Sequence, residues 1–115
     1  MSREIKFRDY ELIKNEMRYF DLDSYDRQDH NSYGNLTQFT GLRDKNGVEI
    51  FEGDVYCYPN DFPKSVESTP FEISEVIFIE GAFRIGDYLL SEYKEEGEVI
   101  GNIFENPELL EDSHE

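Results

Sequence analysis

Short stretches that mix apolar and polar residues recur along the chain, and their pattern predicts β-strands. Residues 4–8 alternate polar and apolar side chains, as a half-buried strand does. Short strands separated by turns, without a long amphipathic helix, predict a mainly β fold with a small barrel. The other stretches of this kind, bounded by Gly, Asn, Asp or Pro, are residues 36–42, 48–51, 55–58, 83–85 and 99–104.

Two turns and one central strand are the clearest parts of the pattern. Asn46 and Gly47 lie between apolar stretches, and both residue types tolerate the positive φ of a tight turn. Glu80 and Gly81 form a second predicted turn. Residues 76–79 precede it and are apolar on both faces, so we expect them to form the central strand of the fold.

Two segments leave their secondary structure open. The apolar residues of 9–20 fall near helical spacing, but a strand pair across Asn15 also fits them. Residues 88–90 fit either a strand or a turn of helix. Residues 21–35 are polar and predict a loop, and residues 59–70, with three of the four prolines, predict an irregular connection.

The C-terminal segment predicts a bulged strand followed by a short helix. Gly101 interrupts the last apolar stretch, where it allows a bulge or close packing. We expect a helix to start at 106–110, because Asn106 suits the cap and Pro107 suits the first helical position. Residues 111–115 are charged and are expected to form an acidic tail.

Length and composition indicate one compact domain. A chain of 115 residues is the size of one ordinary domain. Its 8 Leu, 9 Ile, 5 Val and 9 Phe are enough to build a core. We divide this domain into an N-terminal strand and variable loop region (1–36), a barrel-forming part (37–110) and the tail (111–115).

The net charge is −16, and most of it lies in the second half of the chain. Residues 1–58 carry 8 basic and 12 acidic side chains, whereas residues 59–115 carry 3 basic and 15 acidic ones. Such a surface repels phosphate backbones and anionic lipid, which argues against direct binding of nucleic acid or membranes. It attracts basic partners, although the charge also fits a role in solubility alone.

No motif predicts catalysis or a bound cofactor. Cys57 is the single cysteine and is expected to be a buried, inert thiol, because His30 and His114 lie in a loop-like segment and near the end of the chain. No apolar run reaches the length of a signal-peptide core or a membrane span, so we expect a cytoplasmic protein.

The densest group of possible metal ligands does not fit a known site. An EF-hand loop beginning at Asp21 fails, because Tyr25, Asp26 and Ser32 occupy positions that require other residues. A solvated loop is therefore the favoured interpretation, and no metal is predicted. The members of this group are Asp21, Asp23, Asp26, Asp29 and His30.

One strand is a candidate protein-binding surface. Tyr56 and Tyr58 share a strand face and follow the acidic Glu52 and Asp54. If exposed, this aromatic and acidic strip suits a basic or proline-containing segment of a partner. The alternative is that the two rings pack beneath the N-terminal segment. Asp54 is also the best single candidate for a catalytic carboxylate.

Three blocks of the sequence resemble the YopX family of small phage and prophage proteins. They are residues 3–8 (REIKFR), residues 38–55 (QFTGLRDKNG, continuing through EIFEGDV) and residues 99–110 (VIGNIFENPELL). Their order and spacing span almost the whole chain. The resemblance implies a mostly β fold with an SH3-like barrel in the C-terminal part. It implies no reaction and no catalytic residues, and nothing is carried over to 9–35 or 59–72.

Together these observations predict an acidic, non-enzymatic interaction protein encoded by a phage or prophage. Its partner would be a basic protein, and in a sharper version the acidic surface imitates DNA and occupies a nucleic-acid-binding protein. Two alternatives remain open, namely an enzyme that acts on a small molecule through carboxylates and a structural, self-assembling protein. Formation of a homo-oligomer is left open as well.

Overall fold

A computed structural model describes residues 4–21, 36–60 and 70–112, and in these ranges the fold is mainly β, as predicted. The two short helices are α1 (Leu90–Tyr93) and α2 (Glu108–Asp112). The strands are β1 (Lys6–Glu11), β2 (Glu16–Asp21), β3 (Thr37–Arg43), β4 (Glu49–Phe51), β5 (Asp54–Pro59), β6 (Phe71–Ile79), β7 (Ala82–Ile85), β8 (Tyr88–Leu89) and β9 (Glu98–Asn102).

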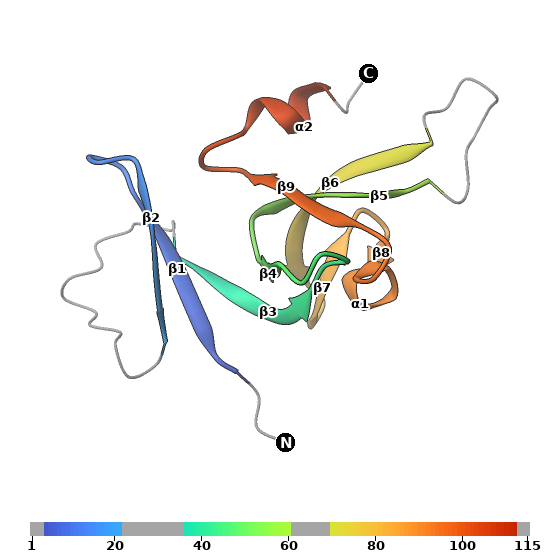
Figure 1. Cartoon of the computed structure of the whole chain (residues 1–115), viewed down its shortest axis with the longest axis horizontal. Helices are drawn as coiled ribbons and strands as arrows, with labels where there is room; N and C mark the ends of the chain where they lie inside the picture. The colour runs from blue at the N-terminus through green and yellow to red at the C-terminus, as the bar shows by residue number, and fades with distance from the viewer. Residues whose placement is uncertain (1–3, 22–35, 61–69, 113–115) are drawn as a thin grey trace.

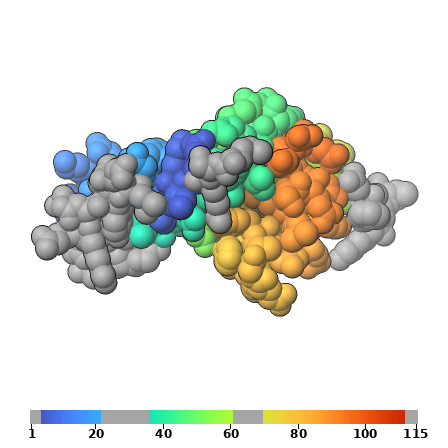
Figure 2. Space-filling model, turned by 90° about the horizontal axis from the view of Figure 1, so that it is seen from below, coloured from blue at the N-terminus to red at the C-terminus, as the bar shows by residue number. Residues whose placement is uncertain are grey.

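The strands form two sheets, which Figure 1 shows side by side. The first has the order β2-β1-β3-β4, and the second, curled into a barrel-like layer, has the order β8-β7-β6-β5-β9. The β1–β2 hairpin stands apart from the curled sheet, and β3 runs from that hairpin towards the barrel. Figure 2 shows the blue hairpin at one end of the molecule and the orange segment, which includes β8 and α1, towards the other.

Residues 9–20 form the strand pair that was one of the two open interpretations. β1 and β2 pair antiparallel from Lys6 opposite Asp21 to Glu11 opposite Glu16. Asn15 takes a φ of 55° in the turn, a conformation that Asn tolerates better than most residues. The boundary predicted at residue 36 falls just before β3, which pairs with β1 as well as with β4.

β6 is the central strand of the second sheet, but much of it is exposed. It begins at Phe71, five residues before the predicted strand, and pairs first with β5 and then with β7. Only Val76 of the predicted run is buried, and Ile77, Phe78 and Ile79 are 36%, 52% and 48% exposed. Because β5 begins at Asp54, opposite the middle of β6, the last residues of β6 extend beyond it.

The core lies between the curled sheet and α1. Tyr56 and Tyr58 point into it from β5, and α1 adds Leu90 and Tyr93. The rings of Tyr58 and Tyr93 are 5.5 Å apart, within the range of favourable aromatic pairs. The Tyr56 hydroxyl donates to the backbone carbonyl of Tyr93 at 2.9 Å, so its polar atom is satisfied inside the core. The segment 88–90 is thus a short strand that leads into a helical turn.

Both predicted turns are present, with one difference in backbone conformation. Glu80 and Gly81 have φ values of 55° and 81°, which is the signature of a two-residue hairpin turn between β6 and β7. In the β3–β4 hairpin Gly47 has a φ of 81°, whereas Asn46 stays at negative φ. Asp44 rather than Asn46 organises that turn, because its carboxylate accepts the Asn46 N–H at 2.8 Å.

The C-terminal segment confirms the prediction for Gly101 and shifts the predicted helix. The pairing of β5 with β9 is irregular next to Gly101. α2 begins at Glu108 and includes residues 111 and 112, which were expected to belong to the tail. The side-chain oxygen of Asn106 accepts the backbone N–H of Asn102 at 3.2 Å, and its backbone carbonyl accepts the Leu109 N–H at 3.1 Å where the helical turn begins. No helix in the described ranges is long and apolar enough to cross a membrane.

Replacing Gly101 by alanine should destabilise the protein. A Cβ atom there would lie 2.6 Å from the Asn106 side-chain oxygen and 2.9 Å from a methyl group of Leu109. We expect a loss of about 1–3 kcal/mol in the free energy of unfolding, measured by urea denaturation. Adding Asn106→Ala should cost less in the Gly101→Ala background than in the wild type, because it removes one clashing atom. Additive costs would contradict this explanation.

Candidate functional site

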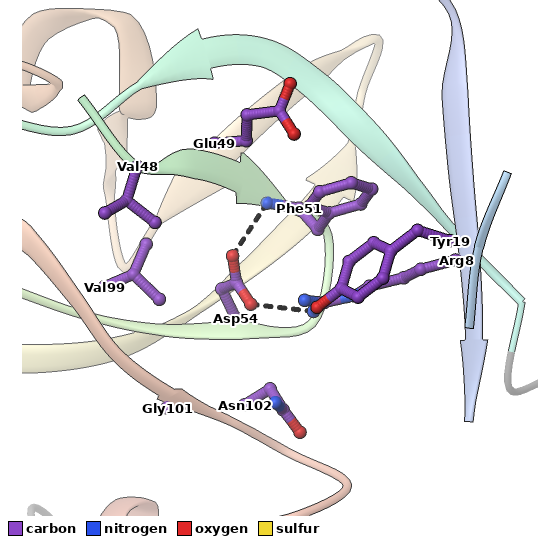
Figure 3. Close-up of a pocket in the computed structure, with 9 residues that line it drawn as sticks. All are labelled: Arg8, Tyr19, Val48, Glu49, Phe51, Asp54, Val99, Gly101 and Asn102. Atoms are coloured by element: carbon purple, nitrogen blue, oxygen red, sulfur yellow. Dashed lines mark hydrogen bonds and ion pairs between the residues drawn. The ribbon is translucent and has the colours of Figure 1, made fainter. Parts of the chain in front are cut away.

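A cleft of about 290 Å³ lies between the β1–β2 hairpin and the curled sheet (Figure 3). Its wall contains the charged side chains of Arg8, Glu49 and Asp54. Arg8 and Tyr19 come from the hairpin, and the other lining residues come from the barrel side. These are Val48, Glu49, Phe51, Asp54, Val99, Gly101 and Asn102.

The floor of the cleft is a buried ion pair between Arg8 and Asp54. Arg8 Nη2 lies 2.7 Å from Asp54 Oδ1, and the two side chains are only 4% and 3% exposed. Arg8 Nε donates to Thr37 Oγ1 at 3.2 Å, and Nη2 also reaches the carbonyl of Glu52 at 3.3 Å. The guanidinium lies over the Phe51 ring, 4.8 Å from its centroid. Arg8 therefore contacts three separate segments of the chain.

Asp54 is held on both of its carboxylate oxygens. Oδ1 faces Arg8, and Oδ2 accepts the Phe51 N–H at 2.7 Å, as Figure 3 shows. Burial raises the pKa of Asp54, while Arg8 and the Phe51 N–H act in the opposite direction. Both oxygens of Asp54 are engaged inside the fold, and the carboxylate joins β1 to the start of β5.

The rim of the cleft holds the β1–β2 hairpin against β4, a strand of the same sheet. Glu49 is bound by Lys6 and, at 3.3 Å, by Arg43. The Tyr19 ring lies edge-on to Phe51 with centroids 5.5 Å apart and remains 62% exposed. Both carboxylates of the cleft therefore have partners: Glu49 links strands of the first sheet, and Asp54 links the first sheet to the second.

Asp44 is a second structural carboxylate, which the sequence analysis did not single out. It is 6% exposed, and its Oδ1 accepts the N–H of Asn46 and, at 2.9 Å, that of Val48. Its Oδ2 accepts the N–H of Val99 in β9 at 2.9 Å. Asp44 therefore ties the β3–β4 turn to the last strand. An Asp three residues before a turn glycine is a recognisable turn former, but its long-range bond to β9 has no local signal.

The predicted docking strip on β5 does not form. Tyr56 and Tyr58 are 0% and 1% exposed, and Asp54 is 2% exposed. Glu52 is half-buried, and its backbone N–H donates to the Gln38 carbonyl at 2.9 Å. The rings pack beneath β8 and α1 rather than beneath the N-terminal segment. The physical reason is that β5 lies between β6 and β9, so its tyrosine face is the inner face of the curled sheet.

The remaining chemical candidates are placed as follows. Cys57 is half-buried rather than buried, and burial together with the nearby Glu98 carboxylate raises the pKa of its thiol. Of the aspartate-rich group only Asp21 belongs to the described residues; Asp23, Asp26, Asp29 and His30, like His114, lie outside them. Within the described ranges, no three His, Cys, Asp or Glu side chains are grouped so that they could hold a metal ion.

The acidic character of the chain lies on the exposed surface of its second half. In residues 70–111 nine acidic side chains are exposed, while Arg84 and Lys94 are half-buried. In the described residues before position 61 the exposed charges balance, with acidic Glu4, Glu16 and Asp21 and basic Lys14, Arg43 and Lys45. The nine acidic residues are Glu72, Glu80, Asp87, Glu92, Glu95, Glu96, Glu105, Glu108 and Glu111.

Removing either partner of the buried ion pair should be costly. Arg8→Met or Asp54→Asn leaves the other group buried without its partner, and we expect each to lower the free energy of unfolding by about 3–5 kcal/mol. The matched control is Lys6→Met, which breaks the more exposed pair with Glu49 and should cost no more than about 1 kcal/mol. Urea denaturation measures all three. Equal costs for Arg8→Met and Lys6→Met would contradict the assignment.

The cost of Arg8→Met should depend on pH. Burial already raises the pKa of Asp54 above 3.8, and loss of the guanidinium should raise it further. A carboxyl with a raised folded-state pKa stabilises the fold below its unfolded pKa and loses this contribution as pH rises through its folded pKa. The deficit of Arg8→Met relative to the wild type should therefore grow from about pH 4 to about pH 7. A deficit that is constant over this range would contradict the prediction.

Comparisons with known proteins agree with this structure. The crystal structure of protein EF1440 from Enterococcus faecalis is similar, with a TM-score of 0.62 and 28% sequence identity over 95% of this chain and 99% of that chain. No curated protein matches in sequence. The family model described as YopX protein matches residues 4–111, which confirms the resemblance seen in the sequence, and the chain therefore belongs to the YopX family.

Proposed function

We propose that this chain is an acidic interaction protein, encoded by a phage or prophage, that binds a basic protein in the bacterial cytoplasm. The observation that carries the proposal is the contrast between the two halves of the surface. Residues 70–111 expose nine acidic side chains, and the two basic side chains of that range are half-buried. Membership of the YopX family supports the phage or prophage origin.

The acidic surface favours association with a positively charged protein. A field of one sign over half of a small protein steers an oppositely charged partner and raises its association rate. The densest part is the segment 87–98, where Asp87, Glu92, Glu95 and Glu96 are exposed on the β7–β8 turn, α1 and the loop after it. Lys94 is the one basic residue in that segment.

The nature of the partner follows from the same charge. A protein that binds nucleic acid presents Lys and Arg to a row of phosphates, and a dense set of carboxylates can occupy those side chains in their place. We therefore propose a nucleic-acid-binding protein as the partner. The proposal is one of binding without catalysis, and the engagement of Asp44 and Asp54 in structural bonds supports it.

Neutralising exposed acidic residues of the second half should weaken the binding. The double variant Glu92→Gln, Glu95→Gln should lose about fivefold or more in affinity for a basic partner captured from bacterial lysate. The control is Glu4→Gln, Glu16→Gln, which removes the same charge from the balanced half and should bind like the wild type. Capture should weaken as salt is raised, and duplex DNA should displace the partner from the protein.

Three outcomes would count against this proposal. These are capture of partners that are indifferent to salt, equal effects of the two double variants, and a partner that binds duplex DNA and this protein at the same time. The first two would argue against charge as the basis of binding. The third would contradict only the proposal that the acidic surface imitates DNA.

A further inference from the structure

The tip of the hairpin formed by β6 and β7 exposes large apolar side chains on both of its faces. Ile77, Phe78 and Ile79 are 36%, 52% and 48% exposed, and Phe83 on the facing strand is half-buried. The Phe78 and Phe83 rings contact each other with centroids 4.9 Å apart. Because successive side chains of a strand point to opposite faces, Phe78 and Phe83 share one face of the hairpin, and Ile77 and Ile79 share the other. We call Ile77 and Ile79 the hairpin patch. Figure 2 shows this end of the hairpin, in gold, projecting from the body of the molecule.

The backbone beside the hairpin patch is open to another strand. The β5–β6 ladder ends at the pair of Val55 with Glu75, so Ile77–Ile79 extend beyond β5. On the other side, β8 pairs only with Arg84 and Ile85 of β7, which leaves Ala82 and Phe83 beyond its end. Within the described ranges, then, each edge of the hairpin tip runs past its last neighbouring strand. An extended segment can add to such an edge and place alternate side chains on the patch.

Exposed apolar side chains that lie together in this way suit a contact with another molecule. Isolated apolar residues on a surface are ordinary, but a contiguous patch marks a contact site or a liability for aggregation. The core of the sheet does not need apolar residues at the tip of the hairpin, because Val76 and Ile85 at its base already fill the core. The apolar residues beyond them therefore serve a contact outside the chain.

The charge of the chain favours a basic segment of another protein over a second copy of the chain as the binding partner. A second copy would bring another chain of net charge −16 against the first, and Glu80 stands exposed in the turn of the hairpin itself. Arg84, the one basic residue of the hairpin, is half-buried. A segment of another protein with Lys or Arg between its apolar residues satisfies both the patch and the surrounding carboxylates.

We infer that the hairpin patch is the docking site for an extended segment of a basic protein in which apolar and basic side chains alternate. The inference rests on the proposed function and adds the surface that the partner's apolar side chains contact. The apolar residues supply affinity through burial, and the acidic surroundings supply attraction over distance.

Three synthetic peptides of eight residues test this inference in the full chain by fluorescence anisotropy. The first alternates Leu and Lys, the second alternates Ser and Lys with the same charge, and the third alternates Leu and Glu. We expect the Leu-Lys peptide to bind about tenfold tighter than the Ser-Lys peptide, because burying its leucines adds to the electrostatic attraction. The Leu-Glu peptide should not bind measurably.

Substitutions in the patch should affect only the peptide with apolar side chains. Ile77→Ser and Ile79→Ser should each weaken Leu-Lys binding about tenfold and leave Ser-Lys binding unchanged. The control is Ile13→Ser in the β1–β2 turn, where the side chain is 91% exposed, and it should bind both peptides like the wild type.

The outcomes separate this inference from the proposed function. If the Leu-Lys and Ser-Lys peptides bind with equal affinity, or if Ile79→Ser binds like the wild type, the inference is overturned while salt-dependent binding of a basic partner stands. If neither peptide binds, both are overturned. If sedimentation shows a wild-type dimer that Ile79→Ser converts to a monomer, the patch is covered by a second copy and the inference is wrong.

Discussion

The buried ion pair between Arg8 and Asp54 joins the first sheet of this protein to the second, and the Asp44 carboxylate adds a further link to β9. Burying two charges costs free energy, and such a pair persists where removing one partner costs still more. Arg8 also reaches Thr37 and the carbonyl of Glu52, so one side chain positions β1, β3 and the turn before β5. Because these bonds have specific directions, they set the orientation of the hairpin, which a purely apolar contact would leave less defined.

The residues that carry the YopX resemblance have structural explanations throughout. Asp44 and Asn102 use their side-chain oxygens to accept backbone N–H groups at turns, and Asp54 does the same beside Arg8. Gly101 leaves room for the side chains of Asn106 and Leu109. The resemblance thus describes how the chain folds, and the partner must be sought on the outer surface.

The outer surface combines two features that suit protein binding. The second half is acidic and attracts a basic protein over a distance of about 8–10 Å in physiological salt. The β6–β7 hairpin provides apolar side chains that act only at contact. Electrostatic attraction by the acidic surface sets the rate at which the two proteins meet. Burial of the apolar side chains sets how long the complex lasts. The two features lie in the same half of the chain, which allows one partner to use both.

The sequence by itself determined most of the strands, the Glu80–Gly81 turn, the special role of Gly101 and the family, because alternation, turn residues and close packing leave local traces. It did not decide between helix and strand for residues 9–20, since both periods fit so short a segment. It also placed Tyr56 and Tyr58 on one face without showing which face is inward. Only the tertiary structure settled these points, and only it paired Arg8 with Asp54. The physical reason is that the residues that cover a strand face, or that neutralise a buried charge, lie far away in the sequence.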